Sequence, residues 1–177
     1  MILGDPNVGK STIFEAIVQS EKYAEKKPSL KYNIYAIKRK LENEEITIEL
    51  YDFPRRELMG TNRPKMYKGT NGAFIVFDIS RPDTFRHTNF WIDELLNYSG
   101  TRKLPIILVA NKIDKREIEG QRTLNPIDAQ QFIFRLNRTT MRLGVENFYL
   151  EVSARERKGV SYLLDTMIRA LKKAYGF

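Results

Sequence analysis

The sequence predicts an α/β fold: a three-layer α/β/α sandwich around a six-stranded mixed sheet with one antiparallel strand. Two continuous apolar runs, over 72–79 and 104–110, have the length and composition of parallel strands that are buried on both faces. Segments with helical spacing of apolar residues alternate with such runs, and right-handed crossovers then place helices on both faces of the sheet. Ligands bind such sheets at the carboxyl ends of the strands, so residues with a chemical role should directly follow strands.

The first predicted strand, residues 1–3, is shorter than the five or six residues usual for a strand, from which we expect a truncated or incompletely ordered N-terminus. The helix that follows has apolar residues at helical spacing: Ile13, Phe14, Ile17 and Val18. The segment 21–31 is polar and contains Pro28, which predicts a surface loop.

Residues 32–41 and 46–51 alternate apolar with polar side chains, which predicts an antiparallel hairpin. In a chain that continues with alternating strands and helices, the hairpin provides one reversed strand, commonly at an edge of the sheet. The stretch 53–69 contains prolines and glycines, so we expect irregular structure there with at most a short helix.

The second half contains one predicted helix over 82–98, whose aromatic side chains Phe85, Phe90 and Trp91 are expected in the core. His87 lies near the start of this helix and is expected to face solvent. The remaining elements are a helix from 125–126 to about 142, a strand over 148–152 and a closing helix over 160–172. The length of the chain predicts a single domain over residues 1–177.

Composition narrows the possible partners. Lysine and arginine number 30 against 22 acidic residues, a net charge of +8, but the excess is dispersed along the chain, so we expect a solvated surface and no nucleic-acid groove. The chain has no cysteine, which excludes disulfides and zinc–thiolate sites within it and fits a reducing compartment. With no apolar run of membrane-spanning length, a cytoplasmic protein is expected.

The sequence GDPNVGKS over residues 4–11 matches the P-loop pattern. In such a loop, backbone N–H groups surround the phosphates of a nucleotide, and the next helix directs its positive end at them. Gly4 and Gly9 allow the close approach of backbone to phosphate, Lys10 carries its ammonium to the β/γ oxygens, and the Ser11 hydroxyl can bind Mg²⁺. The alternative is a glycine turn that caps a helix.

Other polar residues also follow predicted strands. Asp52 comes directly after the hairpin, where a carboxylate can order Mg²⁺ opposite Ser11, although an aspartate at a turn is also common. Asn111, Lys112 and Asp114, in the sequence NKID, follow the strand ending at residue 110.

The carboxylate of Asp114 can accept both the ring N1–H and the amino group of guanine, a donor pair that adenine lacks. Asn111 can reach the purine edge and steady neighbouring loops, and the stem of Lys112 can lie along the ring. A cluster that caps a helix is the competing interpretation. The residues Ser153, Ala154 and Arg155 follow the last strand, where a backbone amide could contact the guanine carbonyl.

Together GDPNVGKS, the region of Asp52, NKID and EVSAR resemble a Ras-superfamily small GTPase. The stretches YKGTNGAFIVFDISRPDTF and EGQR resemble the Rab branch most. The resemblance implies a G domain that binds GDP and GTP with Mg²⁺, changes two switch loops with the γ-phosphate, and meets effector and regulator proteins at membranes. Peripheral membrane association is compatible with it.

The resemblance also implies roles for individual residues. It assigns the phosphate-cradling amides to Asn7, Val8, Gly9, Lys10, Ser11 and Thr12. In the first switch loop it assigns Ser29 to Mg²⁺ and Tyr23 to packing against guanine.

The second switch loop departs from the family pattern. Where the family has Asp-Thr-Ala-Gly-Gln-Glu, this chain has DFPRRE over residues 52–57. Arg55 replaces the glycine whose amide senses the γ-phosphate, and Arg56 replaces the glutamine that orients the attacking water. Pro6 adds bulk near the γ-phosphate. We expect nucleotide binding with slow GTP hydrolysis, in which Arg56 is the candidate catalytic residue through stabilisation of transition-state charge.

Two alternatives stay open. A nucleotide-bound interaction module would have partners that do not distinguish GDP from GTP, and a P-loop kinase of small molecules would leave NKID unexplained. The sequence ends at YGF over 175–177 without the prenylated cysteines of Rab proteins, which predicts a shortened chain, a further domain or function without that anchor.

Overall fold

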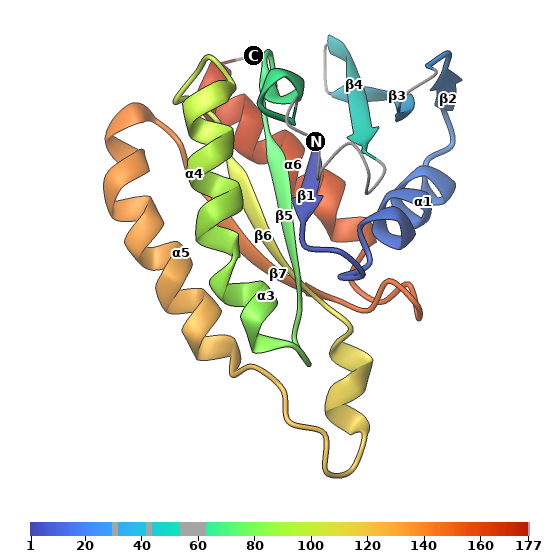
Figure 1. Cartoon of the computed structure of the whole chain (residues 1–177). Helices are drawn as coiled ribbons and strands as arrows, with labels where there is room; N and C mark the ends of the chain where they lie inside the picture. Colours follow the sequence, from blue (N-terminus) through green and yellow to red (C-terminus); the bar gives the residue numbers. More distant parts are fainter. Residues whose placement is uncertain (30–31, 42–43, 54–62, 177) are drawn as a thin grey trace.

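The computed structural model describes residues 1–29, 32–41, 44–53 and 63–176. A single sheet has the strand order β2-β3-β4-β1-β5-β6-β7, with helices on both faces (Figure 1). The strands are β1 Ile2–Gly4, β2 Ala24–Lys27, β3 Asn33–Leu41, β4 Glu44–Asp52, β5 Ala73–Asp78, β6 Ile106–Asn111 and β7 Phe148–Val152. The α-helices are α1 Lys10–Ser20, α3 Pro82–Arg86, α4 Thr88–Tyr98, α5 Pro126–Thr140 and α6 Ser161–Tyr175, and short 3₁₀ helices are η1 Arg63–Tyr67, η2 Ile113–Glu117 and η3 Met141–Leu143.

Each face of the sheet has its own apolar core. Helices α1 and α6 cover one face, where Phe14 and Leu163 pack with Phe74 and Val109. Helices α4 and α5 cover the other, where Trp91 packs in the same cluster as Phe77. Successive residues of β5 and β6 are buried alternately against these two cores, which explains why both strands are continuously apolar.

The parallel strands end together at one edge of the sheet. Ile2 of β1 pairs with Asp52 of β4, Asp78 of β5 pairs with Asn111 of β6, and Asn111 pairs with Val152 of β7. Because each of these strands runs in the same direction, the loops after Gly4, Asp52, Asp78, Asn111 and Val152 all leave from this edge. The sheet therefore gathers the segments that the sequence analysis singled out.

The prediction of six strands is wrong, because the segment 21–31 contains β2 and the sheet has seven. Strand β2 reads AEKK and has no apolar alternation; it is held by antiparallel backbone pairing, from Ala24↔Ile37 to Lys27↔Ile34. Such pairing does not depend on side chains, so no pattern of apolar residues marks this strand. Lysines suit an exposed edge strand. The reversed strand is β3, which lies between β2 and β4 and is therefore not at the edge of the sheet.

The single helix predicted over 82–98 is divided in two at His87. The hydroxyl of Thr88 donates to the carbonyl of Phe85 at 2.7 Å, and such a side-chain bond competes with the regular helical pattern. Trp91 is buried as expected, but Phe90 is 49% exposed, with the guanidinium of Arg63 5.1 Å from its ring centroid. Phe90 was therefore wrongly placed in the core.

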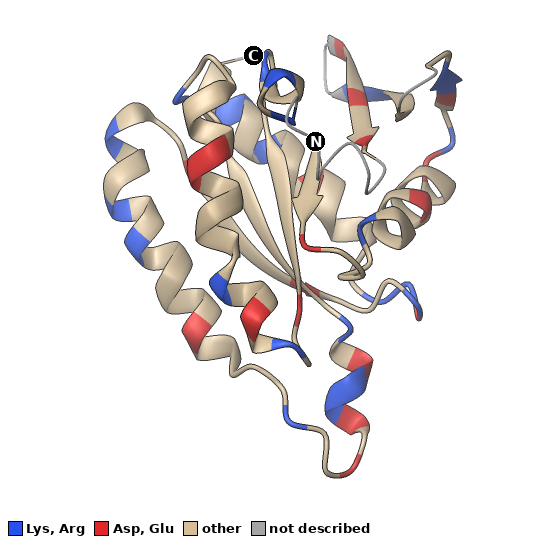
Figure 2. Cartoon of the chain, viewed as in Figure 1, with Lys and Arg blue, Asp and Glu red and all other residues tan. Residues whose placement is uncertain are grey.

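Basic and acidic residues are interspersed along the helices and loops, as the dispersed charge of the sequence predicts (Figure 2). Of the helices in the described part of the chain, none is both long and apolar enough to cross a membrane.

Candidate nucleotide-binding site

Two glycines, Gly4 at the end of β1 and Gly9 directly before α1, could not be replaced by another residue without strain. Gly4 has φ 138°, and a Cβ there would lie 2.2 Å from the carbonyl oxygen of Val76. Gly9 has φ 99°, and its Cβ would lie 2.2 Å from Nδ2 of Asn111. The glycines thus permit the loop to pack against the ends of β5 and β6 as well as to turn.

Lys10, the first residue of α1, folds back over this loop. Its ammonium donates to the carbonyl oxygens of Gly4 at 2.9 Å and Asp5 at 2.7 Å. These bonds hold a positive charge inside the loop and beside the N-terminal end of α1. The arrangement favours an anion at this position.

Asn111 joins three loops through one buried side chain. Its Nδ2 donates to the carbonyl of Val8 at 2.8 Å, and its Oδ1 accepts the backbone N–H of Ala154 at 3.0 Å. Asn111 itself ends β6 and is 2% exposed. The P-loop, the NKID segment and the loop after β7 are therefore fixed relative to one another by a single amide group.

Lys112 makes a second connection to the P-loop. Its backbone is left-handed with φ 68°, and its ammonium donates to the carbonyl of Asn7 at 2.8 Å and lies 2.7 Å from Oδ2 of Asp78. Asp78 was not assigned to the site from the sequence, where it is only the polar end of an apolar run. Burial alone would raise the pKa of Asp78, but bonds from Lys112 and from the hydroxyl and amide of Ser80 outweigh burial and lower it.

Asp114 lies beside the loop that follows β7. The hydroxyl of Ser153 donates to its Oδ1 at 2.6 Å, and Ser153 Oγ also accepts the N–H of Glu156 at 3.2 Å. Backbone bonds between Ser153 and Lys158 close the loop. The side chain of Arg155 is exposed on it. One carboxylate oxygen of Asp114 is thus fixed by Ser153, which orients the group.

Asp52 fits the coordination of a divalent cation. It is 3% exposed, and its Oδ1 is buried without a hydrogen-bond partner among the described residues. Burial raises the pKa of this carboxyl, while the Ser11 hydroxyl, the Lys10 ammonium and the side chain of Asn33 oppose the shift. A buried carboxylate oxygen beside a serine hydroxyl matches the oxygen ligands that Mg²⁺ prefers.

The two residues assigned to the first switch loop lie on either side of β2. Ser29 is exposed, and its hydroxyl accepts the N–H of Tyr32 at 3.3 Å, near the start of β3, where Asn33 pairs with Asp52. Tyr23 is 63% exposed, with the ammonium of Lys22 5.2 Å from its ring centroid. Their roles toward Mg²⁺ and guanine stay predictions.

Three residues missed by the sequence analysis hold the P-loop from the side of α3 and α4. Arg81 donates to the carbonyl of Pro6 at 2.9 Å, Trp91 Nε1 donates to Asp5 Oδ1 at 2.8 Å, and His87 Nδ1 lies 2.7 Å from Asp5 Oδ2. His87 also faces solvent as expected, with its side chain 59% exposed. The acidic second residue of GDPNVGKS was the available signal for such a contact.

The remaining site predictions divide between described and undescribed residues. Val8 is fully buried in the core below the loop, whereas Asn7, with φ 63°, and Thr12 are exposed. Arg56, predicted to be catalytic, lies outside the described residues together with Pro54 and Arg55.

Comparison with known proteins identifies the family. The model of the Ras family matches residues 1–173. The chain belongs to the Ras family. It is similar to Ras-related protein RabC of Dictyostelium discoideum, with 25% identity over 174 residues that cover 97% of this chain and 82% of the relative.

The chain is also similar to Ras-related proteins of two plants. Ras-related protein Rab11A of Lotus japonicus is 27% identical over 168 residues, 95% of this chain and 69% of the relative. Ras-related protein RABA5d of Arabidopsis thaliana is 31% identical over 120 residues, 68% of this chain and 54% of the relative. The chain is thus a Rab-like small GTPase, which confirms the resemblance found from the motifs.

Replacing Asp78 by Asn should lower the thermal unfolding midpoint at pH 7, because a neutral amide cannot pair with the ammonium of Lys112. We expect the free energy of unfolding to fall by about 1–3 kcal/mol. For a chain of this size, each kcal/mol lowers the midpoint by roughly 2–4 °C. Since the pKa of Asp78 is lowered, its stabilisation is present above the unfolded pKa of about 4 and is lost as pH falls through the folded value.

The difference between wild type and variant in calorimetry should therefore shrink below about pH 4. Asp83→Asn, at an exposed position of α3, is the matched control and should change the midpoint little. An unchanged midpoint in Asp78→Asn at pH 7 would refute the role given to this ion pair.

Proposed function

We propose that this Rab-like GTPase binds GDP and GTP with Mg²⁺, hydrolyses GTP slowly, and regulates membrane traffic through effector and regulator proteins that contact its switch loops. The observation that carries the proposal is the position of Asn111, whose amide connects the P-loop with Ala154. This connection supports a single ligand that spans the loops, with phosphates at one end and a base at the other.

The charge and the backbone of the P-loop support the proposal that the phosphates bind there. The first N–H groups of a helix have no acceptor within the helix, and its N-terminal end carries a partial positive charge, so the amides of residues 7–12 are proposed to surround the phosphate oxygens. Lys10 already holds its ammonium over the loop by bonds to two carbonyls. When phosphates bind, we propose that this ammonium turns to the β/γ oxygens.

The base end is supported by the carboxylate of Asp114. Ser153 occupies one of its oxygens, and the carboxylate retains lone pairs for the N1–H and amino group of guanine. Lys112 is held at the P-loop by its ammonium, so its aliphatic stem can lie along a purine ring. Adenine lacks the donor pair that Asp114 would accept, which gives discrimination in favour of guanine.

Ser11, Asp52 and Ser29 are proposed to hold Mg²⁺, Asp52 through its buried Oδ1, which has no hydrogen-bond partner among the residues that the structure describes. A bound Mg²⁺ supplies charge neutralisation at the phosphates. The protein's own part is to keep the Asp52 carboxylate beside the Ser11 hydroxyl in a buried place, where burial makes its ionised form costly without a cation.

Replacing Asp114 by Asn should weaken GDP binding by about 100-fold, because an amide presents one acceptor atom where guanine requires two, and charged hydrogen bonds are worth about 1.5–3 kcal/mol. Displacement of a fluorescent GDP analogue from the nucleotide-free protein measures this. ADP should displace the fluorescent GDP analogue from the wild-type protein only weakly. Asp128→Asn, at an exposed position in the first turn of α5, serves as control. Equal affinity of the wild type for GDP and ADP would contradict guanine recognition.

Single-turnover hydrolysis of bound GTP tests the enzymatic part of the proposal. We expect turnover slower than in a Rab protein with the usual glutamine, and Arg56→Gln should not fully restore it because Arg55 and Pro54 remain. Arg56→Ala should abolish turnover if Arg56 stabilises transition-state charge.

Chromatography of the extracted nucleotide distinguishes the outcomes. Full recovery in Arg56→Gln would overturn the account of the second switch loop. If guanine nucleotide is bound but neither wild type nor variant turns it over, the chain is instead a nucleotide-bound interaction module.

A further inference from the structure

Helix α5 exposes a row of apolar side chains. Ile127, Phe134 and Met141 are 54%, 67% and 54% exposed. They follow one another at intervals of seven residues, and Met141 continues the helical backbone after Thr140 with φ −61° and ψ −28°. Seven residues are close to two turns of an α-helix, so the three side chains lie in one line about 21 Å long. We call this line the apolar row.

A basic row runs beside the apolar row. Arg135, Arg138 and Arg142 are exposed and lie about 40–100° around the helix from Phe134 and Met141. Figure 2 shows these basic residues in the second half of α5 and directly after it. None of the three forms an ion pair within the described part of the chain, whereas the arginines of η1 and η2 each have a carboxylate partner. Guanidinium groups placed in this way attract acidic side chains.

Amide side chains border the apolar row on its other side. Gln130 and Asn137 lie there, and Nδ2 of Asn137 donates to the carbonyl of Asn147, directly before β7, at 3.0 Å. On the opposite side of the helix, the ring centroid of Phe132 lies 5.9 Å from that of Phe85 in α3. From β7 toward α3, the exposed face of α5 therefore presents amides, the apolar row and the basic row. We call this face the α5 surface.

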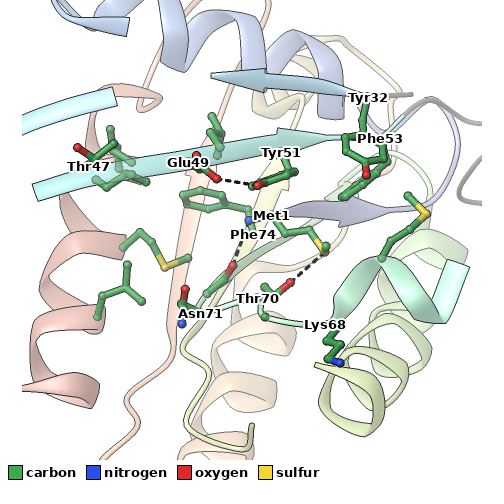
Figure 3. A pocket seen from close by; sticks show the side chains of 18 of the residues that line it. Met1, Tyr32, Thr47, Glu49, Tyr51, Phe53, Lys68, Thr70, Asn71 and Phe74 are labelled. Carbon is green, nitrogen blue, oxygen red and sulfur yellow. Dashed lines mark hydrogen bonds between the residues drawn. The ribbon is translucent and has the colours of Figure 1, made fainter. Parts of the chain in front are cut away.

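The α5 surface is separate from the other parts of the molecule discussed above. It includes none of the residues assigned to nucleotide, Mg²⁺ or catalysis. It is also distinct from a cavity of about 870 Å³ beside β4, which is lined by Thr47, Glu49 and Phe74 among others and by no residue of α5 (Figure 3). An interaction at the α5 surface thus leaves the nucleotide site accessible.

We propose that the α5 surface binds an amphipathic helix of a partner protein, which has an apolar face and acidic residues along one flank. The apolar side chains of this helix seat between Ile127 and Phe134 and between Phe134 and Met141, as the ridges of one helix pack into the grooves of another. Its carboxylates pair with the basic row. Such charged pairs at the border of an interface set the orientation and the choice of partner.

Charge argues against a second copy of this chain as the occupant. A second α5 would bring three more arginines to the contact, and α5 itself has one acidic residue, Asp128. An anionic bilayer would match the basic row, but it would also cover the exposed Gln130 and Gln131, whose amides find no hydrogen-bond partners among acyl chains. The polar side chains of a partner helix supply such partners.

The first test uses a fluorescently labelled peptide of three repeats of Leu-Glu-Ala-Leu-Glu-Ala-Ala, cross-linked on its alanine face so that it is helical. We expect saturable binding with a Kd below about 100 μM in fluorescence anisotropy. The same cross-linked peptide with lysine in place of every glutamate should bind at least about tenfold more weakly, because the basic row repels it. No binding of the acidic peptide, or equal binding of both peptides, would overturn the proposal.

Phe134→Glu tests the apolar row. It removes the central contact and places a like charge beside the glutamates of the peptide, so the acidic peptide should bind at least about tenfold more weakly. Tyr162→Glu on α6 is the matched control, because Tyr162 is 66% exposed, and binding should not change. If the two variants bind the acidic peptide equally well, the peptide lies elsewhere and the proposal is wrong.

The double variant Arg135→Glu with Arg138→Glu tests the basic row. It should reverse the preference, so that the lysine peptide binds more tightly than the glutamate peptide by at least about tenfold. A loss of folding would weaken the binding of both peptides, whereas an exchanged preference requires these side chains to face the charged flank. An unchanged preference for the glutamate peptide would contradict the assigned role of the basic row.

The other occupants are tested without peptide. We expect the wild type and Phe134→Glu to sediment identically in analytical ultracentrifugation, and neither to float with vesicles that contain phosphatidylserine. A dimer that Phe134→Glu abolishes would assign the α5 surface to a second copy of the chain. Vesicle binding that the same variant abolishes would assign it to a membrane. Either result would overturn the proposal of a partner helix.

Discussion

The side-chain amide of Asn111 is the interaction on which the rest of the site depends. It is buried at the end of β6, donates to the P-loop at Val8 and accepts from Ala154 after β7. Position 9 requires a glycine, because Nδ2 of this amide occupies the space that a Cβ would fill. Three loops far apart in the sequence thus share one buried hydrogen-bonding group, and removal of that group would leave a carbonyl and an N–H without partners.

Two buried aspartates at the same edge of the sheet show how neighbouring groups determine chemistry. Asp78 has Lys112 and Ser80 as partners, so its pKa is lowered and it acts as a fixed anion that holds Lys112 at the P-loop. Asp52 has a buried oxygen without a partner in the described part of the chain, and burial raises its pKa. The first aspartate is satisfied by the protein, whereas the second is suited to a cation that arrives with the nucleotide.

Sequence reasoning located the strands whose burial is nearly complete and the motifs at their ends. Strands β5 and β6 were placed within two residues because fully buried parallel strands are continuously apolar. The bounds of β7, which is only partly buried, were also predicted. It missed β2, which is held by backbone pairing between polar residues. It also missed the contacts of Asp5 with Trp91 and His87, since only the crossover from β5 through α3 and α4 brings them together.

Hydrogen exchange in Asn111→Ala tests most directly whether this amide couples the loops. Mass spectrometry would compare exchange in the wild type and the variant, for peptides that cover residues 4–12 and 153–158, without added nucleotide. We expect both segments to exchange faster in the variant, together and by similar factors, while the core peptides of β5 and α6 change little. Faster exchange in only one of the two loops, or in neither, would contradict the account of Asn111 as the connection between them.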